Sequence, residues 1–200
     1  GRQVQQLHLQ PGDFIFLSFP TKSKMHEPHP FSLVSLPDQN GIFKLTIRAD
    51  GDFTSKLHEI KPGTRAQILG GFGRYQSFIN EHDQDKNLVM ITGGIGITPL
   101  FSLIPQNMSH KILLFYSAHK KDELLYQEKL TKWQHSSNFN GFWQLGRFSD
   151  DFILNNLPDN WQKNSIFLIS GPIPLIHHWE KILLTNQVHY KNIFKEEFSW

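Results

Sequence analysis

The chain contains no cysteine among its 200 residues. This absence excludes disulfide bonds, thiolate-bound iron–sulfur clusters and cysteine-based zinc sites, and it is compatible with a reducing compartment. No apolar run reaches the length of a membrane-spanning helix, and no signal peptide is visible. Because the chain begins at Gly1 and not at a methionine, we expect a fragment of a longer protein. The lack of a membrane segment here therefore says little about the parent protein.

The sequence also lacks an excess of charge of either sign. Its formal net charge is +2, charged residues make up 19% of it and no basic block occurs, so nucleic acid is not an expected partner. Apolar residues reach 38% and include 17 phenylalanines. This composition is typical of a globular chain, whose length suits one large domain or two of roughly 100 residues.

Signatures of metal and hydrolase chemistry are missing as well. Although 11 histidines are present, His26 and His29 lack a carboxylate partner at ligand spacing, and the adjacent His177 and His178 cannot both face one ion well. We therefore expect no metal site. A G-x-S-x-G motif is absent, as is cysteine, which excludes the common serine and cysteine hydrolase signatures.

The first part of the sequence is strand-like and divided by turns. The segment 37–41 reads Pro-Asp-Gln-Asn-Gly, which is a strong hairpin signal. Short strands at this spacing suggest a small antiparallel barrel. The expected elements are strands at 13–19, 31–36, 42–48 and 64–69 and one helix at 55–60.

Strands and helices alternate after the polar run at 81–86, where we place the boundary between domains 1–84 and 85–200. This alternation predicts a five-stranded parallel sheet with helices on both faces, which binds ligands at the carboxyl ends of its strands. The expected strands are 88–91, 112–116, 141–145, 166–169 and 192–194, and the expected helices are 99–104, 122–134, 150–157 and 174–185.

The stretch around which the chain is organised runs from residue 87 to 101. A buried strand is followed by Gly93-Gly94-Ile95-Gly96, and Thr98 and Pro99 suit the N-cap and the first turn of a helix. Bare glycine backbone before a helix N-terminus is a natural site for a phosphate or a carboxamide. On pattern alone, a tight connection without a ligand is an equally good interpretation.

Several further motifs follow one another in the order of a known family. His29-Pro30-Phe31-Ser32 lies in the barrel part, Gly70-Gly71-Phe72-Gly73 forms a turn, Ser170-Gly171-Pro172 ends a strand, and the chain closes on an acidic and aromatic segment at 194–200. With these motifs the chain resembles ferredoxin–NADP reductase-type flavin domains, and among them the branch of ferric reductases and NADPH oxidases. The resemblance implies a β + α/β fold, in which a Greek-key flavin-binding barrel lacking its first strand precedes a doubly wound nucleotide-binding domain.

For the flavin, the resemblance implies that the Ser32 hydroxyl lies near flavin N5 and that Pro30 and Phe31 lie along the ring system. His29 stands where soluble relatives keep an arginine on the pyrophosphate. The alternative for this segment is an ordinary barrel strand with Phe31 in the core. The expected pyrophosphate loop at the start of the barrel helix consists of Arg48, Gly51, Asp52, Phe53, Thr54 and Ser55.

For the nicotinamide dinucleotide, the resemblance implies that the glycine loop binds it and that Thr98 contacts its carboxamide. The segment Ser170, Gly171 and Pro172 is expected to lie beside nicotinamide C4. Phe198 is expected to cover the flavin ring, with Trp200 as its rival. The basic and hydroxyl groups Ser117, His119 and Lys120 favour the 2′-phosphate of NADPH, with NADH as the alternative. The residues implied to be catalytic are Ser32, Ser170 and Phe198, and those implied to bind the dinucleotide include Gly93, Gly94, Gly96, Thr98 and Pro99.

The function implied by the resemblance is that of an NAD(P)H-dependent FAD oxidoreductase. Hydride would pass from NADPH to FAD, and single electrons would then pass to a downstream acceptor. The expected acceptor is a haem in a membrane domain of the parent chain, leading to ferric iron or dioxygen, with this module on the cytosolic face. The alternatives are a stand-alone soluble flavin or ferric reductase and a redox-inert nucleotide-binding docking module.

Overall fold

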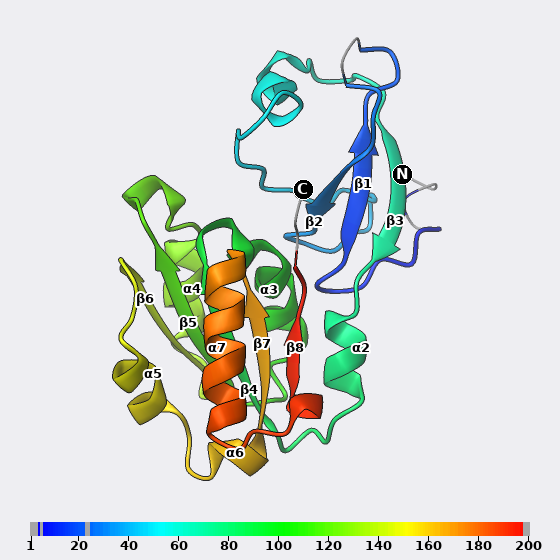
Figure 1. Ribbon diagram of the computed structural model, residues 1–200. Coiled ribbons are helices and arrows are strands. Elements are labelled where there is room, and N and C mark those ends of the chain that lie inside the picture. The colour runs from blue at the N-terminus through cyan, green and yellow to red at the C-terminus, as the bar shows by residue number, and fades with distance from the viewer. Residues whose placement is uncertain (1–3, 5, 23–24, 198–200) are drawn as a thin grey trace.

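A computed structural model describes residues 4, 6–22 and 25–197 and shows two sheets, one above the other in Figure 1. The smaller sheet is antiparallel with the order β2-β1-β3, and the larger one has the order β6-β5-β4-β7-β8. No helix in the described ranges is long and apolar enough to cross a membrane. The strands of the small sheet are β1 (Phe14–Ser18), β2 (His29–Ser32) and β3 (Gln67–Phe72).

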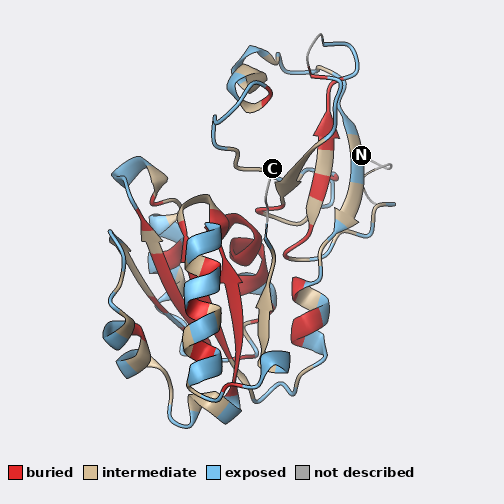
Figure 2. Ribbon diagram, viewed as in Figure 1, coloured by how far each residue is buried: buried red, intermediate tan, exposed pale blue. Residues whose placement is uncertain are grey.

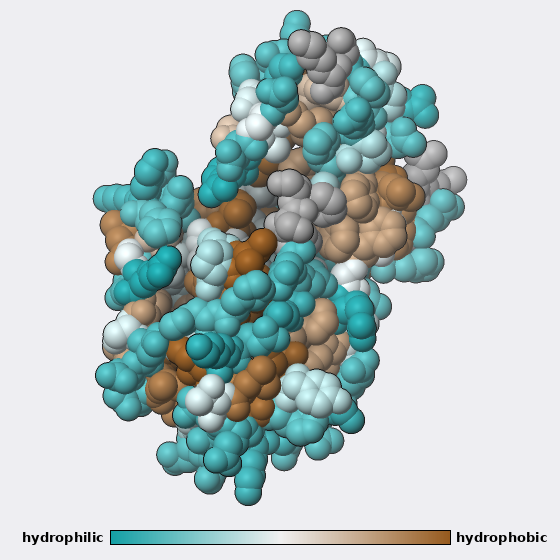
Figure 3. All heavy atoms as spheres, viewed as in Figure 1, coloured by the Kyte–Doolittle hydropathy of each residue, from teal (hydrophilic) through white to brown (hydrophobic). Residues whose placement is uncertain are grey.

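The small sheet has apolar side chains on both faces. Ile15 and Leu17 of β1 are buried, and Leu17 joins a cluster with Phe19, Met25 and Phe53. On the other face, Phe72 packs on the ring of Phe14 with 5.7 Å between ring centroids, while Phe72 itself stays 40% exposed. Figure 3 shows this apolar area on the outer surface of the sheet. The alternation of buried and exposed positions is typical of a strand with one covered face.

Several expectations for the small sheet are wrong. The strand expected at 31–36 is β2 at His29–Ser32, and only an isolated bridge at Leu33 follows it. Residues 42–48 form only an isolated bridge between Leu33 and Leu45, because the Lys44 N–H donates to the Ser35 hydroxyl at 3.0 Å and not to a carbonyl of a neighbouring strand. The strand expected at 64–69 begins later, at Gln67, and continues to Phe72, so most of the turn expected at 70–73 is strand. The expected helix at 55–60 is present as the 3₁₀ helix η1 (Thr54–Glu59).

The larger sheet confirms the predicted five parallel strands and the doubly wound class. Its central strands are buried along their length, as Figure 2 shows, because continuous apolar runs are covered from both sides. Every neighbouring pair is parallel. The strands are β4 (Asn87–Gly93), β5 (Ile112–Ala118), β6 (Phe139–Leu145), β7 (Ser165–Ser170) and β8 (Ile193–Lys195).

Helices cover both faces of this sheet and form two separate cores. One core contains residues of α2 (Tyr75–Asn80), α3 (Ile97–Leu103) and α4 (Gln127–Trp133), and the other contains residues of α5 (Asp150–Asn156) and α7 (Ile173–Thr185). Within β4, Leu88 and Met90 face the first core and Val89 faces the second. The remaining helical segments are η2 (Gly94–Gly96), η3 (Ile104–Gln106), η4 (Lys121–Glu123), α6 (Trp161–Asn164) and η5 (Tyr190–Asn192).

Helix α2 was not expected from the sequence. It lies before the predicted boundary at 84 but packs beside β8 on the larger sheet (Figure 1). Its Tyr75 and Phe78 are buried and contact the ring of Phe194 in β8, with centroid distances of 4.9 and 5.1 Å. The structural join between the two sheets is therefore the turn ahead of α2.

Candidate functional site

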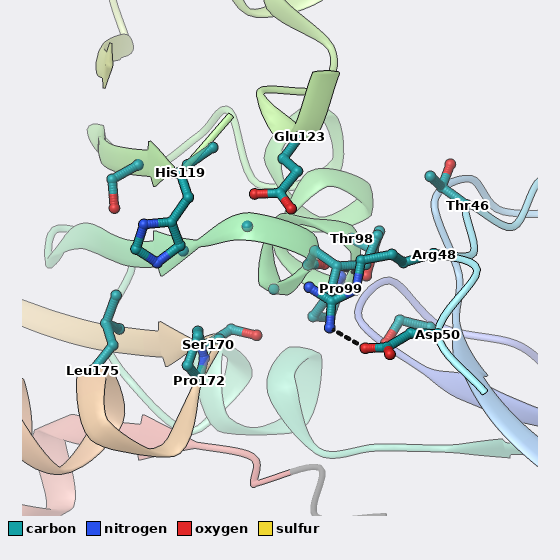
Figure 4. Close-up of a pocket in the computed structure, with 18 of the residues that line it drawn as sticks. Thr46, Arg48, Asp50, Thr98, Pro99, His119, Glu123, Ser170, Pro172 and Leu175 are labelled. Atoms are coloured by element: carbon teal, nitrogen blue, oxygen red, sulfur yellow. Dashed lines mark hydrogen bonds and ion pairs between the residues drawn. The ribbon is translucent and has the colours of Figure 1, made fainter. Parts of the chain in front are cut away.

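A cleft of about 490 Å³ lies between the two sheets, at the carboxyl ends of β4, β5 and β7. Figure 4 shows side chains on both sides of it, with Arg48 and Asp50 from a loop of the small-sheet part and Thr98, His119 and Ser170 from the part built on the larger sheet. Across the cleft, the hydroxyl of Tyr126 donates a hydrogen bond to Thr46 Oγ1. Tyr126 is itself held by stacking on Phe101, with 4.0 Å between ring centroids. Both domains therefore contribute to one site.

Two glycine loops meet in the floor of the cleft. A Cβ atom on Gly96 would lie 2.5 Å from the Cα of Gly171, a distance that real Cβ atoms do not tolerate. Gly171 has φ +138°, a conformation that other residues rarely adopt. The loop after β4 and the loop after β7 can therefore approach this closely only because both positions are glycine. The result is a floor of bare backbone.

The predicted cap of the helix after this loop is wrong. Helix α3 begins at Ile97 with Gly96 at the N-cap, and no described side chain caps it. Because the 3₁₀ turn η2 already winds the chain into the helix, the helix starts before Thr98. The Thr98 hydroxyl instead donates to the Ile95 carbonyl at 2.9 Å, and Thr98 lines the cleft.

A buried hydroxyl group without a hydrogen-bond partner in the described part of the chain lies beside the two glycine loops. Ser170 ends β7 opposite Thr92 of β4, and both hydroxyl oxygens are buried with no hydrogen-bond partner in the described part of the chain. The nearby Tyr75 hydroxyl donates to the Ile169 carbonyl at 3.3 Å, and burial raises the Tyr75 pKa. An unpaired buried hydroxyl costs roughly 1–3 kcal/mol. Since Ser170 lines the cleft, a polar group bound there would offset this cost.

The wall on the side of the small sheet is formed by β2 and the loop after residue 45. Phe31 and Ser32 line the cleft, but Phe31 also packs on Phe53 in the small sheet's core at 5.9 Å. The His29 ring packs against the same core, with 4.4 Å between its centroid and that of the Phe53 ring. Phe53 is only 4% exposed. The structure thus combines the two interpretations of this segment, a core strand and a cleft wall.

The expected pyrophosphate loop presents a guanidinium to the cleft. Arg48 and Asp50 both line it, and their side chains form an ion pair of 2.7 Å (Figure 4). Asp50 N–H donates to the Thr54 hydroxyl at 2.8 Å, which fixes the turn. An exposed ion pair contributes only about 0–1 kcal/mol. The Arg48 guanidinium is therefore available to a bound anion at small cost.

Charged groups also gather at the far end of the cleft, beyond β5 and β6. Ser117 and His119 line this end, together with Glu123 and Arg147. Glu123 is held in place by Tyr116, whose hydroxyl donates to the Glu123 carbonyl at 2.7 Å, and burial raises the Tyr116 pKa to about 12. This end of the cleft can accept either a phosphate or a hydroxyl group.

Most of the predicted cofactor residues line the cleft: Pro30, Phe31, Ser32, Arg48, Thr54, Gly93, Gly94, Gly96, Thr98, Pro99, Ser117, His119, Ser170, Gly171 and Pro172. Others are not among its lining residues: His29, Gly51, Asp52, Phe53, Ser55 and Lys120. Phe198 and Trp200 lie outside the described residues. Sequence reasoning missed Thr46, Ile47, Asp50, Ile95, Ala118, Glu123, Gly146, Arg147, Pro174 and Leu175. Arg147 could have been found, because it follows β6, whose end lies at the same sheet edge as that of β5.

An antiparallel sheet joined to a doubly wound sheet, with a glycine-floored cleft between them, defines the class of two-domain flavin and nicotinamide oxidoreductases. Comparison with family models agrees with this class. Residues 1–94 match the FAD-binding domain and residues 90–181 match the oxidoreductase NAD-binding domain. Together the two matches cover residues 1–181, so the chain combines an FAD-binding domain with an oxidoreductase NAD-binding domain.

Curated relatives are similar over much of the chain. NADH-cytochrome b5 reductase 2 of Scheffersomyces stipitis is 27% identical over 187 residues, which cover 84% of this chain and 61% of the relative. One component of the Na(+)-translocating NADH-quinone reductase of Actinobacillus succinogenes is 26% identical over 98% of this chain and 54% of the relative. The chain thus spans about half the length of the curated relatives it matches.

Solved structures share the fold. The Amycolatopsis cytochrome P450 reductase GcoB superposes with a TM-score of 0.78 at 16% identity, over 95% of this chain and 61% of that one. The flavohemoglobin of Malassezia yamatoensis, solved with bound FAD and heme, gives a TM-score of 0.78 at 21% identity, over 95% of this chain and 52% of that one.

Proposed function

We propose that this module transfers hydride from NADPH to FAD and then passes electrons one at a time to a separate acceptor. The observation that carries the proposal is the cleft itself, in which Ser32 of the flavin side and the loops of Gly96 and Gly171 line one space. FAD, when bound, supplies the chemistry that converts a two-electron donor into one-electron steps. The protein itself has to bind the two cofactors and hold them in the right orientation.

The residues of the cleft suit these tasks. The Ser32 hydroxyl can both donate and accept a hydrogen bond, as a ring nitrogen that changes its protonation requires. The Gly96–Gly171 floor allows a flat ring to approach the backbone, and Thr98 and Ser170 offer hydroxyls to a carboxamide. Holding two rings in contact supplies proximity, which is a large part of the rate in such reactions.

We propose NADPH as the donor. Arg147 and His119 line the adenosine end of the cleft, and a guanidinium is the side chain best suited to bind a phosphate. Glu123 lines the same end and would suit a ribose hydroxyl, as NADH requires. Relatives named NADH reductases make NADH the alternative.

For the acceptor, we propose a haem held by a membrane domain of the parent protein. The haem would pass the electrons on to ferric iron or dioxygen, and the module would lie on the cytosolic face of the membrane. The support is the His29-Pro30-Phe31-Ser32 motif, which resembles that branch, and the fact that the chain spans only part of its relatives. Relatives named cytochrome b5 reductases are in keeping with a haem acceptor. A stand-alone ferric reductase would need no such partner.

The test is anaerobic reduction of the FAD-loaded chain. We expect NADPH to bleach the flavin absorbance, and Ser32→Ala to slow this bleaching about 10-fold, because one hydrogen bond to the reacting ring is lost. Ser109→Ala, an exposed position outside the cleft, serves as the control. A chain that binds FAD but is not reduced by either dinucleotide would instead be the redox-inert docking module.

A further inference from the structure

The loop that carries Arg48 into the cleft is held at its two ends by the small-sheet part of the chain (Figure 4). Before the loop, Leu45 forms the isolated bridge, and after it, the Asp50 N–H donates to the Thr54 hydroxyl at 2.8 Å. Between these points, residues 47–49 make no backbone hydrogen bond to a described residue. The Arg48 side chain therefore projects from a stretch whose own backbone gives it little support.

Tyr126 reaches this loop from the part of the molecule built on the larger sheet. Its hydroxyl donates a hydrogen bond to Thr46 Oγ1, and Thr46 stands two residues before Arg48. Thr46 lines the cleft, whereas Tyr126 is not among the lining residues. Any influence of Tyr126 on a bound cofactor therefore has to pass through Thr46.

The ring of Tyr126 is fixed by its own part of the molecule. It stacks on Phe101 of α3, which is 3% exposed, with an angle of 24° between the ring planes. The Tyr126 carbonyl accepts the Leu130 N–H of α4 at 3.0 Å. Burial raises the pKa of Tyr126, so its hydroxyl keeps its proton and remains a donor at neutral pH.

The backbone of Tyr126 is also unusual. Its φ is +62°, a left-handed conformation that is uncommon for residues other than glycine. Conformations of this kind persist only where the surrounding structure holds them, and they gather at functional positions. In this fold the conformation accompanies two side-chain contacts, the stack on Phe101 and the hydrogen bond to Thr46.

The hydrogen bond between Tyr126 and Thr46 links two walls of the cleft. Through Phe101 it connects Thr46 to helix α3, which begins directly after Gly96 of the glycine floor. On the other side, Thr46 leads into the Arg48 loop. The position of the guanidinium relative to the floor therefore depends in part on this single bond.

We propose that Tyr126 is a positioning residue for FAD, because its hydroxyl holds the loop 46–50 in the place where the Arg48 guanidinium can meet the flavin pyrophosphate. The inference rests on the proposed function only for the assignment of Arg48 to the pyrophosphate, since residues 1–94 match the FAD-binding domain. Without the bond, the loop has to be ordered when FAD binds. That ordering costs affinity.

The test is the affinity of the whole chain for FAD, measured by titration of the flavin fluorescence. Tyr126→Phe keeps the ring that stacks on Phe101 and removes the hydroxyl. We expect it to raise the Kd for FAD about 5-fold, as the loss of one hydrogen bond predicts. Tyr190→Phe is the matched control, because this ring is 66% exposed and does not line the cleft. It should keep the wild-type Kd.

Thr46→Val removes the acceptor and should raise the Kd to a similar extent. Because both changes break the same hydrogen bond, the double variant should bind FAD no more weakly than the weaker single variant. A wild-type Kd in Tyr126→Phe would overturn the proposal, even if its unfolding midpoint fell. Effects that multiply in the double variant would also overturn it.

These outcomes are separate from the fate of the proposed function, because FAD binding is measured without hydride transfer. The expected pattern of Kd values in a chain that no dinucleotide reduces would support the role of Tyr126 and count against the proposed function. Rapid reduction by NADPH with a wild-type Kd in Tyr126→Phe would do the reverse.

Discussion

Gly96→Ala should reduce NADPH-dependent flavin reduction by at least about 100-fold, because it forces apart the two loops that form the floor of the cleft. The new Cβ would lie 2.5 Å from the Gly171 Cα and 2.6 Å from its nitrogen. Both are backbone atoms, so no flexible side chain can move away. A displacement of about 1 Å at a reacting centre is sufficient for a loss of this size. The measurement is the rate of anaerobic flavin bleaching.

The same substitution should cost about 1–3 kcal/mol of unfolding free energy, as is usual for overpacking. Gly63→Ala is the matched control, because its Cβ would meet nothing within 4 Å and only its φ of +85° is strained. It should lose some stability and keep the rate. If Gly96→Ala retains the wild-type rate, the two glycine loops do not form the nicotinamide floor.

Arg147→Ala should lower kcat/KM for NADPH about 10- to 100-fold and change that for NADH by less than about 2-fold. The physical reason is the loss of a charge-assisted pair between the guanidinium and the 2′-phosphate, which NADH does not possess. Steady-state rates with the two dinucleotides give the ratio directly. His119→Asp should lower the ratio further, because it places a negative charge at the same end of the cleft.

Lys120→Ala provides the control for this experiment. Lys120 neighbours His119 in sequence and carries the same charge as Arg147, but it is exposed and does not line the cleft. It should leave the preference unchanged. A preference that depends on Lys120 and not on Arg147 would contradict the geometry of the adenosine end.

The larger sheet could be predicted from the sequence because its strands are continuous apolar runs with few alternatives. Leu88 to Ile91 is buried on both faces and is too short for a helix. The segment expected as a strand at 42–48 alternates apolar residues with Lys44, Thr46 and Arg48, but it pairs only through the bridge between Leu33 and Leu45, and the sequence does not reveal that pairing. Helix α2 has six residues, so its stability comes from packing on Phe194 and not from its own sequence.

The glycine loop could be identified because its function requires a backbone that only glycine provides. Arg147 belongs to no motif, and only its position after β6, which ends beside β5 at the same sheet edge, could have indicated its place in the cleft. The ring contact between His29 and Phe53 is also a product of tertiary packing. Sequence reasoning therefore identified residues that are needed for a particular backbone conformation. It missed residues that reach the cleft only because their strands are neighbours in the sheet.

Helix α2 packs with the larger sheet although it precedes that sheet in the chain. Because Tyr75 and Phe78 are buried against the larger sheet, α2 must travel with that sheet as one rigid block. The flavin-side sheet is joined covalently to this block through the glycine-containing turn that precedes α2. The Gly12 N–H also donates to the buried Ser102 hydroxyl of α3 at 2.8 Å, and Val34 packs in the core of the larger sheet, so any change in the width of the cleft would have to break buried contacts.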